Sequence, residues 1–392
     1  MMYSEIEAKR LVIQAGKQLI KNGLIARTWG NISARISDTQ FVISPSGKAY
    51  ETLLPEQIVT VNISDCSYSG SIKPSTEKGI HADVYRLRPE ANFIIHTHQT
   101  KASVVSIAGE DIRGYADEFA EIFGDVIPCA EYGISSTKTL RNAVADAVKK
   151  HPKSQAFLMR HHGALCIGKD YSYAFVISRT LETVCEKAIG SYVLRGHNLT
   201  SYSDDARRNL YLKTQAKGAT LPVDCPDMGS SKRSGDIFTL EYENKTYSYD
   251  LNALPTDLFE PAIIHAKIYL CSGVNSIIHI TEPDVLAVSA TGKTMHPAID
   301  DLAQIAGVSI RCGDSKSACK KLKNRNAVFI RNAGALCTGN CFEDAEAVGM
   351  ILTKSCEAEI FSTFLPKRHR LGIFDAFIQR TFYVLKYSKL KK

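Results

Sequence analysis

The chain has 392 residues, which is long for one hydrophobic core, so we expect two domains. No apolar run is long enough to span a bilayer, and the first residues lack the layout of a signal peptide, so we expect a cytoplasmic protein. The net charge is +7, but residues 367–392 hold eight Lys or Arg against one acid, and the neutral remainder argues against nucleic-acid binding.

Helices and short strands are expected to alternate through the first half of the chain. Apolar spacing and bounding Gly, Ser and Asp residues predict helix 6–20, strands 41–47 and 59–64, helix 78–86, strand 92–98, a loop at 128–136, helix 137–149, strand 156–163 and helix 171–194. Helices mixed with short, hairpin-like strands predict a three-layer α/β/α domain. No Gly-x-Gly-x-x-Gly motif opens a helix after a strand, so a dinucleotide-binding fold has no support.

The sequence contains an internal repeat. Residues 155–168 recur at 326–339 with seven of fourteen positions identical and no gap, and residues 81–98 match 265–281. The two matches keep their order along the chain. Two related domains explain this pattern more simply than chance does, so we expect the same α/β fold twice, with the second copy truncated.

The repeat and the composition between its copies set the expected boundaries. Residues 216–235 are rich in Gly, Pro and Ser and show no apolar period, which is typical of a linker. We expect a first domain at 1–214, a linker at 215–235, a second domain at 236–365 and a basic tail at 366–392.

The cysteines bear on the redox state of the protein. The chain has eleven, and none forms a Cys-x-x-Cys pair. In a protein expected to be cytoplasmic, this pattern predicts reduced, mostly buried thiols and no disulfide framework.

Two histidines stand at the end of an expected buried strand. Alternation along the strand points His96 and His98 to the same face, where they could share one ion. His162 follows another apolar strand and could supply a third ligand, while Gly163 allows close backbone approach. Three histidines with an open fourth position are typical of catalytic zinc, although histidines satisfied by hydrogen bonds at a strand end are the structural alternative. Glu77 could reach the metal or act as an acid–base.

Seven short motifs occur in order across residues 5–195: Gly-Asn-Ile-Ser with Arg35, Ile-Ser-Pro-Ser-Gly, Lys-Pro-Ser-Thr-Glu, His81 with Tyr85, Arg-Pro, His-Thr-His and His-His-Gly. In this combination the chain resembles the class II aldolase/adducin family, and within it the fuculose-1-phosphate aldolase branch. The resemblance implies a zinc ion, or another divalent cation, held by His96, His98 and His162. It also implies Glu77 as the catalytic acid–base.

The resemblance implies a phosphorylated sugar as substrate. The family's phosphate-binding positions fall on residues whose hydroxyl, amide or backbone groups suit phosphate oxygens, namely Asn31, Ser46, Gly47, Ser75 and Thr76. Turn chemistry explains the Ser-Pro-Ser-Gly and Lys-Pro-Ser segments equally well. Tyr132 lies in a loop that family members place near the active site, and an ordinary packing role is the alternative.

The implied reaction is cleavage or formation of a ketose 1-phosphate through a metal-stabilised enediolate. Pentulose-phosphate epimerases of the family usually carry Asp at position 77, so Glu77 favours aldolase or decarboxylase-like members. Epimerase, dehydratase or decarboxylase chemistry at the same metal is the close alternative, and a non-catalytic, adducin-like scaffold is the distant one.

The second copy has lost most of these residues. His279 stands for His96, but Thr281 replaces His98, Ala333 replaces His162 and Pro261 replaces Glu77. Counterparts of the Gly-Asn-Ile-Ser, Ser-Pro-Ser-Gly and Lys-Pro-Ser-Thr segments are not recognisable. We therefore expect the second domain to bind no zinc and to serve structure or assembly.

Two further expectations concern partners. Family aldolases form ring-like homotetramers, so the resemblance implies a homo-oligomer, as a dimer of tandem chains or a tetramer. In the tail, apolar residues fall at helical spacing among basic ones: Phe374, Phe377, Ile378, Phe382 and Leu385. Packing on the body or on a neighbouring subunit, and peripheral contact with an anionic membrane, are the two interpretations of this pattern.

Overall fold

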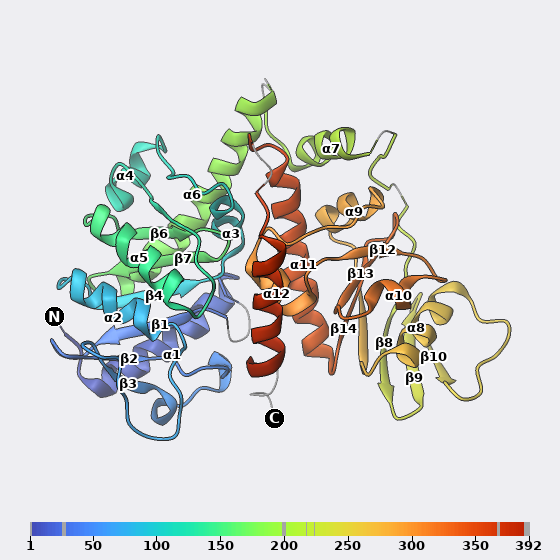
Figure 1. The fold of residues 1–392 in the computed structure, drawn as a ribbon, viewed down its shortest axis with the longest axis horizontal. Helices are drawn as coiled ribbons and strands as arrows, with labels where there is room; N and C mark the ends of the chain where they lie inside the picture. Colours follow the sequence, from blue (N-terminus) through green and yellow to red (C-terminus); the bar gives the residue numbers. More distant parts are fainter. Residues whose placement is uncertain are drawn as a thin grey trace. The chain divides into compact units, whose positions relative to one another are not determined.

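The computed structural model describes residues 2–25, 29–197, 201–216, 218–222, 224–366 and 369–387 (Figure 1). The chain divides into two compact units, formed mainly by Met1–Tyr192 and by Val193–Leu385. Across the described ranges, each unit holds one seven-stranded sheet flanked by helices, which confirms the α/β fold in two copies. No helix within those ranges combines the length and the apolarity needed to cross a bilayer.

The first sheet is mixed, and its central strands carry the site. Its strands run in the order β3-β2-β1-β4-β7-β6-β5, and all neighbours are antiparallel except β5 and β6. The strands are β1 (Asn31–Arg35), β2 (Gln40–Ile43), β3 (Val59–Asn62), β4 (Phe93–Thr97), β5 (Cys129–Ala130), β6 (Ala156–Met159) and β7 (Gly163–Gly168). Because β4 lies between β1 and β7, His96 is opposite Asn31 on one side and Leu165 on the other.

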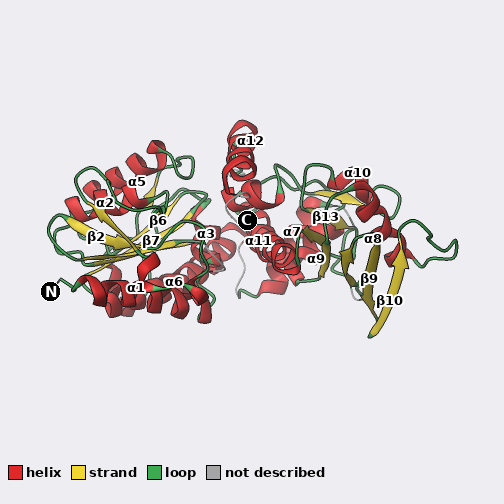
Figure 2. Cartoon of the chain, turned by 90° about the horizontal axis from the view of Figure 1, so that it is seen from below, coloured by secondary structure: helices red, strands yellow, loops and turns green. Residues whose placement is uncertain are grey.

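Helices cover both faces of the first sheet, as predicted. Figure 2 shows α2 and α5 on one face and α1 and α6 on the other. A core of aliphatic and aromatic side chains fills the layer between the sheet and the α2–α5 pair. The helices of this unit are α1 (Glu5–Lys21), the short 3-10 turns η1 (Tyr50–Thr52) and η2 (Pro55–Gln57), α2 (Lys78–Leu87), α3 (Thr100–Ser106), α4 (Asp117–Phe123), α5 (Lys138–Lys150) and α6 (Tyr171–His197).

The second sheet repeats the topology of the first, strand for strand. Its order is β10-β9-β8-β11-β14-β13-β12, and its parallel pair is again the edge pair, β12 and β13. The strands are β8 (Ser230–Ser234), β9 (Ile237–Tyr242), β10 (Lys245–Asp250), β11 (Ser276–Ile280), β12 (Arg311–Gly313), β13 (Ala327–Ile330) and β14 (Ala335–Gly339). The strands β8, β11 and β14 are therefore the counterparts of β1, β4 and β7.

The helical layers of the second unit differ from those of the first in length and number. A core cluster joins the sheet to α8 and a short α10, while α9 and α11 pack on the other face. The helices are α7 (Asp204–Gln215), α8 (Glu260–Cys271), α9 (Pro283–Ala290), the π-helical turn η3 (Leu302–Ala306), α10 (Ala318–Leu322), α11 (Phe342–Ser362), α12 (Ile373–Phe382) and the π-helical turn η4 (Tyr383–Tyr387).

The structure differs from the expected boundaries at the linker. Strand β8 lies inside the expected linker 215–235 and pairs with both β9 and β11. It was missed because its Ser- and Lys-rich sequence buries only Ser231, so its place depends on backbone pairing rather than on apolar alternation. The expected end of the first domain at residue 214 is also wrong, because α7 packs against α9 and α11 of the second unit.

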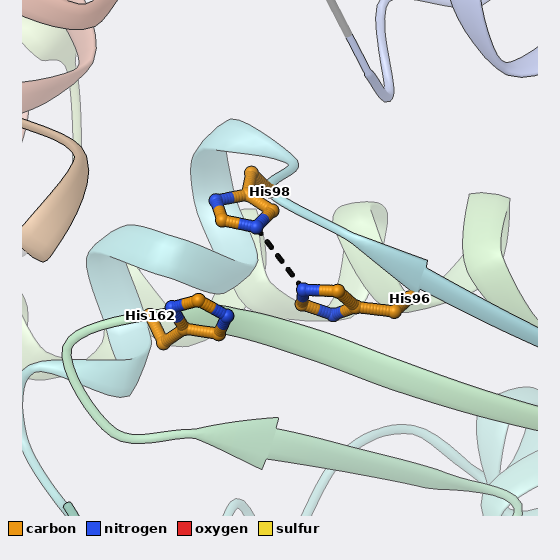
Figure 3. A group of neighbouring side chains, drawn as sticks. All are labelled: His96, His98 and His162. Atoms are coloured by element: carbon orange, nitrogen blue, oxygen red, sulfur yellow. Dashed lines mark hydrogen bonds between the residues drawn. The ribbon is translucent and has the colours of Figure 1, made fainter. Parts of the chain in front are cut away.

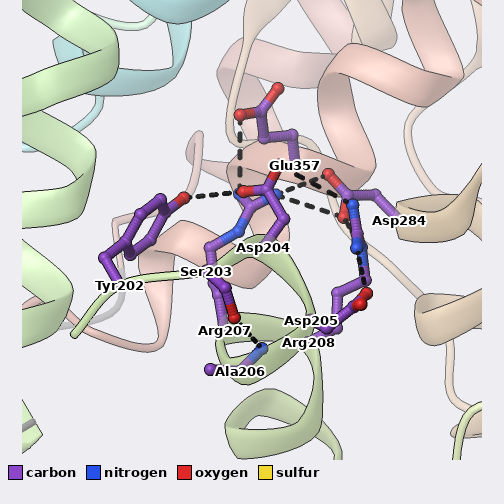
Figure 4. A network of polar contacts seen from close by, with 9 residues as sticks. All are labelled: Tyr202, Ser203, Asp204, Asp205, Ala206, Arg207, Arg208, Asp284 and Glu357. Atoms are coloured by element: carbon purple, nitrogen blue, oxygen red, sulfur yellow. Dashed lines mark hydrogen bonds and ion pairs between the residues drawn. The ribbon is translucent and has the colours of Figure 1, made fainter.

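Buried charges hold α7 in the second unit (Figure 4). Arg207 is 1% exposed and donates to both carboxylate oxygens of Asp284 on α9, at 2.9 and 3.2 Å. Its other terminal nitrogen lies 3.5 Å from Glu357 on α11, and Arg208 donates to Asp284 at 2.7 Å. Removing one partner would leave a buried charge unpaired, which typically lowers the free energy of unfolding by about 3 to 5 kcal/mol. This cluster therefore assigns α7 to the second unit.

One disulfide contradicts the expectation of reduced thiols. Cys271, at the end of α8, is bonded to Cys319 in α10, 48 residues further along the chain. The sequence did not reveal the pair because only the packing of α10 on α8 brings the two sulfurs together. The bond joins the two helices on the same face of the second sheet.

Candidate metal centre

The three histidines implied as ligands lie together in the first unit (Figure 3). Their candidate ligand atoms all lie within 4.8 Å of one another, and His96 Nε2 is 3.0 Å from His98 Nε2. The His162 ring lies 5.0 Å from that of His96 and 4.5 Å from that of His98, measured between centroids. Among the described residues this is the group of His, Cys, Asp or Glu side chains that could hold a metal ion.

Backbone geometry sets the spacing of these rings. His161 has φ of 61° in the tight turn between β6 and β7, and this left-handed residue turns the chain so that His162 faces β4. A Cβ at Gly163 would lie 2.3 Å from the Thr97 carbonyl oxygen, so only glycine allows β7 to approach β4 this closely. The sequence-based expectation was that Gly163 lets the backbone approach the metal site; the structure shows close approach of β7 to β4 at this residue.

His96 has the tautomer that a metal ligand needs. Its Nδ1–H donates to the Ala164 carbonyl at 2.8 Å, which leaves the lone pair of Nε2 directed toward His98. Burial lowers the pKa of His96 to about 3, so the ring is neutral at physiological pH. Imidazole nitrogens gathered in this way are the ligands that a divalent cation such as zinc prefers, so these residues fit such an ion.

Glu77 completes the cluster from the N-cap position of α2. One carboxylate oxygen lies 3.3 Å from His96 Nε2, and the other lies 3.3 Å from His162 Nε2. Asn31 donates to the first oxygen at 2.9 Å, and the Ser135 hydroxyl approaches the second at 3.4 Å. Burial raises the pKa of Glu77, but the imidazoles beside it outweigh burial and hold the pKa well below its ordinary value. The group is therefore a carboxylate.

A chain of hydrogen bonds fixes Asn31 behind Glu77. Because the Asn31 amide nitrogen donates to Glu77, its oxygen must accept from His81 Nε2–H, at 2.5 Å. His81 Nδ1 then accepts from the Ser33 hydroxyl at 2.6 Å, and Ser33 accepts from Tyr85 at 2.8 Å. This order explains why His and Tyr stand one helical turn apart on the buried face of α2. In this structure the amide nitrogen of Asn31 holds the Glu77 carboxylate, and its amide oxygen is held by His81.

The other predicted phosphate-binding residues lie in two neighbouring loops. Ser46 and Gly47 follow β2, whereas Ser75 and Thr76 precede α2. A backbone bridge joins the two loops, and the Ser75 N–H donates to the Ser44 carbonyl at 3.0 Å. Hydroxyl and backbone groups from both loops thus gather close to the first turn of α2, where peptide dipoles favour an anion.

The loop before α5 reaches the site through residues that the sequence patterns did not single out. Ser135 approaches Glu77, as described above, and Ser136 shares a hydrogen bond of 2.8 Å with Thr76. The run of hydroxyls from Ser135 to Thr137 is the signal that could have identified them. Tyr132, singled out in the same loop, packs edge-on against His161 with 5.5 Å between ring centroids.

The equivalent position in the second unit keeps the scaffold and loses the ligands. Ser231 bonds to His265 at 2.6 Å and to Tyr269 at 2.7 Å, as Ser33 does to its two partners, so β8 is the counterpart of the Gly-Asn-Ile-Ser strand. His279 uses both ring nitrogens: Nε2 donates to the Ala333 carbonyl at 2.5 Å and Nδ1 accepts from a backbone N–H at 3.1 Å. It therefore offers no lone pair to an ion.

The second unit also has acidic residues where the first has its Ser-Pro-Ser-Gly loop. A pocket of about 660 Å³ is lined by the carboxylates of Asp227, Glu241 and Glu243, among others. Sheet register places Leu240 where the first unit has Ile43, so the acidic hairpin that follows corresponds to the Ser-Pro-Ser-Gly loop. These carboxylates would repel phosphate, which agrees with the loss of the ligand residues there.

These observations define a tandem of α/β domains with a three-histidine centre in the first. The model of the Class II Aldolase and Adducin N-terminal domain matches residues 10–189 and 240–360. The matched segments make up most of the chain and fall one in each unit. The chain belongs to the class II aldolase and adducin family.

Solved structures of this family cover about half of the chain. An L-fuculose 1-phosphate aldolase is 26% identical and covers 52% of this chain and 94% of its own, with a TM-score of 0.46. The enzyme of that name from Thermus thermophilus is 26% identical, covers 48% and 96%, and has a TM-score of 0.41. YgbL from Klebsiella pneumoniae, for which aldolase, epimerase and decarboxylase are all named, is 22% identical, covers 52% and 97%, and has a TM-score of 0.45.

Proposed function

We propose that the first unit is a zinc-dependent lyase that cleaves or forms a ketose 1-phosphate. The observation that supports this most directly is the convergence of His96, His98 and His162 on the Glu77 carboxylate. Membership of the class II aldolase and adducin family points to the same chemistry. The hydroxyl-rich loops beside α2 suit a phosphate group on the substrate.

The roles of the residues follow from their chemistry. His96, His98 and His162 would hold a divalent cation, which would supply positive charge to stabilise the enediolate left by cleavage of a carbon–carbon bond. Glu77 is the base and acid that moves the proton, because its carboxylate is ionised and lies beside the histidines. Asn31 and Ser135 hold the two oxygens of that carboxylate in place. Ser46, Gly47, Ser75 and Thr76 bind the phosphate.

A screen of phosphorylated ketoses with the purified chain tests the proposal. We expect one of them to yield dihydroxyacetone phosphate and an aldehyde, with activity lost in Glu77→Gln and in His98→Ala. His279→Ala is the matched control, because it removes the equivalent histidine from the second unit, where both ring nitrogens are already bonded. Activity that survives both changes in the first unit would contradict the mechanism.

The same screen separates the related reactions. Epimerase activity would return an isomeric sugar phosphate, and decarboxylase activity would release carbon dioxide from a sugar-acid phosphate. Either product, still dependent on His98 and Glu77, would keep the metal site and replace the lyase assignment. A chain that turns over none of these substrates and purifies without stoichiometric metal would instead favour a scaffold.

We also propose that the chain assembles as a dimer of tandems, in which each inert second unit occupies the place of an active domain. The support is the repeat together with the matched topology of the two sheets. Sedimentation equilibrium measures the mass directly. A monomeric mass at micromolar concentration would contradict this assembly.

A further inference from the structure

Helix α12 exposes most of its large apolar side chains, with Ile378 partly buried. In α12 and the turn η4 that follows, six large apolar residues are between 44% and 82% exposed: Ile373, Phe374, Phe377, Phe382, Val384 and Leu385. With about 100° between successive helical positions, all but Phe382 fall within an arc of about 120°, and Phe382 lies beside that arc. Single exposed apolar residues are normal on a protein surface, but a continuous patch of this kind usually marks a contact site.

The opposite side of α12 is fixed to the second unit by polar contacts. Gln379 is 2% exposed and accepts from the Gln304 side chain at 3.0 Å. Arg380 donates to the Gln304 carbonyl at 2.8 Å and to the Asn326 side chain at 2.6 Å. Ala376 is the small apolar residue buried on this side. The fold therefore anchors the helix by its polar side and leaves the phenylalanines facing outward.

This orientation bears on the two interpretations of the tail. If the apolar side chains served packing within the chain, they would be buried, as the apolar faces of α2 and α8 are. Phe374, at 74% exposed, and Phe377, at 61%, are not. Packing on the described part of the second unit therefore does not account for this side of the helix.

The charge of the following residues points to the kind of partner. Four of the seven residues from 386 to 392 are Lys and none is acidic, whereas residues 1–366 carry no net charge. A second copy would offer the same apolar side and the same lysines, so it would supply no opposite net charge for them. An anionic lipid surface is complementary to both features, because it takes up phenylalanine side chains and attracts lysines.

We propose that the exposed apolar face of α12, with the lysines after it, binds the protein peripherally to anionic membranes. The side chains of Ile373, Phe374 and Phe377 would enter the interface between headgroups and acyl chains. The helix would lie on the bilayer and not cross it. This proposal is independent of the chemistry proposed for the first unit.

Cosedimentation with vesicles tests the proposal without any substrate. The full chain is mixed with vesicles of phosphatidylcholine alone or with about one third phosphatidylglycerol. We expect binding to the anionic vesicles, about tenfold weaker binding to the neutral ones, and release by high salt. Phe374→Ser with Phe377→Ser should weaken anionic binding at least about tenfold.

A matched control distinguishes this surface from general stickiness. Leu270→Ser with Phe342→Ser removes two other side chains of the second unit that are 60% and 57% exposed, and it should bind vesicles like the parent chain. Replacing Lys389, Lys391 and Lys392 by Gln should weaken binding to anionic vesicles only. Because the apolar residues changed are exposed and the lysines follow the helix in sequence, a thermal melt should report unchanged folding.

Several results would overturn the proposal. The proposal is wrong if the parent protein stays in the supernatant with anionic vesicles. It is also wrong if the parent and the phenylalanine variant bind those vesicles equally. A parent dimer that dissociates in the phenylalanine variant, with no vesicle binding by either, would assign the patch to a second copy of the chain.

Discussion

The two units of this chain share a scaffold and differ in chemistry. Both have the same strand order. His161, which precedes the ligand His162, and Asn332, which precedes its replacement Ala333, have the same left-handed φ of 61°. A Cβ would lie 2.3 Å from a neighbouring carbonyl oxygen at Gly163 and 2.2 Å at Gly334. The close approach of the two central strands is therefore a property of the fold and persists where the ligand residues have been replaced.

The histidine that both units retain, His96 in the first and His279 in the second, differs in which of its ring nitrogens is hydrogen-bonded. In the first unit, His96 ties Nδ1 to a carbonyl and keeps the Nε2 lone pair for an ion. In the second unit, His279 ties Nε2 to the Ala333 carbonyl, which lies where His162 has its place in the first. Restoring a lost ligand alone would therefore not restore a metal site, because both ring nitrogens of His279 are already hydrogen-bonded.

The largest expected effect is on metal content and turnover. If the first unit acts as proposed, His162→Ala should lose the divalent ion and reduce activity by about a thousandfold or more, because the ion would supply the main stabilisation of developing charge. His279→Ala should keep both the metal content and the activity of the parent chain. Elemental analysis of the purified variants, alongside the activity assay, measures the contrast. Equal metal loss in the two variants would break the distinction drawn between the units.

Acid should weaken both units through their equivalent buried histidines. Burial lowers the pKa of His81 and of His265 to about 3, against an ordinary value of 6.5. The unfolded chain thus binds a proton that the folded chain does not, so stability is complete above pH 6.5 and falls as the pH drops toward 3. Each histidine accounts for up to about 4 to 5 kcal/mol of that loss.

Chemical denaturation of His265→Gln across this pH range measures that contribution. With decreasing pH, the second unit of the variant should lose less stability than that of the parent chain. The carboxylates that titrate in the same pH range are present in both proteins, so their contribution cancels in the comparison. Identical slopes would mean that His265 is protonated in the folded protein.

Removing Asn31 should impair catalysis without removing the metal. Asn31→Ala takes away the donor to Glu77 and the acceptor for His81, so the carboxylate loses its fixed orientation. We expect kcat to fall about 10- to 100-fold with the metal content unchanged, as for other residues that orient a metal site. If KM rises and kcat does not change, Asn31 acts mainly on phosphate binding, as its family position implies.

Ser135 should have the smallest effect of the set. Its hydroxyl approaches Glu77 at 3.4 Å, which is a long contact, so Ser135→Ala should lower kcat about two- to fivefold. Ser135→Thr keeps a hydroxyl and should recover most of the activity. Steady-state kinetics of the two variants measures the difference. An alanine variant that is as active as the parent would remove Ser135 from the site.

Features that depend on local pattern could be predicted from the residues alone. Apolar spacing predicted α1, α2, α5 and α6, and the repeat predicted two α/β domains, because side-chain periodicity and turn residues act over short stretches. Alternation along β4 and the residue after it predicted that His96 and His98 share one face, and their meeting with His162 was expected from the family pattern.

Features that depend on which distant segments meet could not be predicted in this way, because they arise from the packing of the folded chain. Sheet register made Asn31 a support for Glu77, and the packing of α10 on α8 brought Cys271 to Cys319. Pairing with β9 and β11 made a strand of a segment with no apolar alternation. The direction of α12 was also set this way, because helical spacing identifies an apolar side but not which side the rest of the chain will hold.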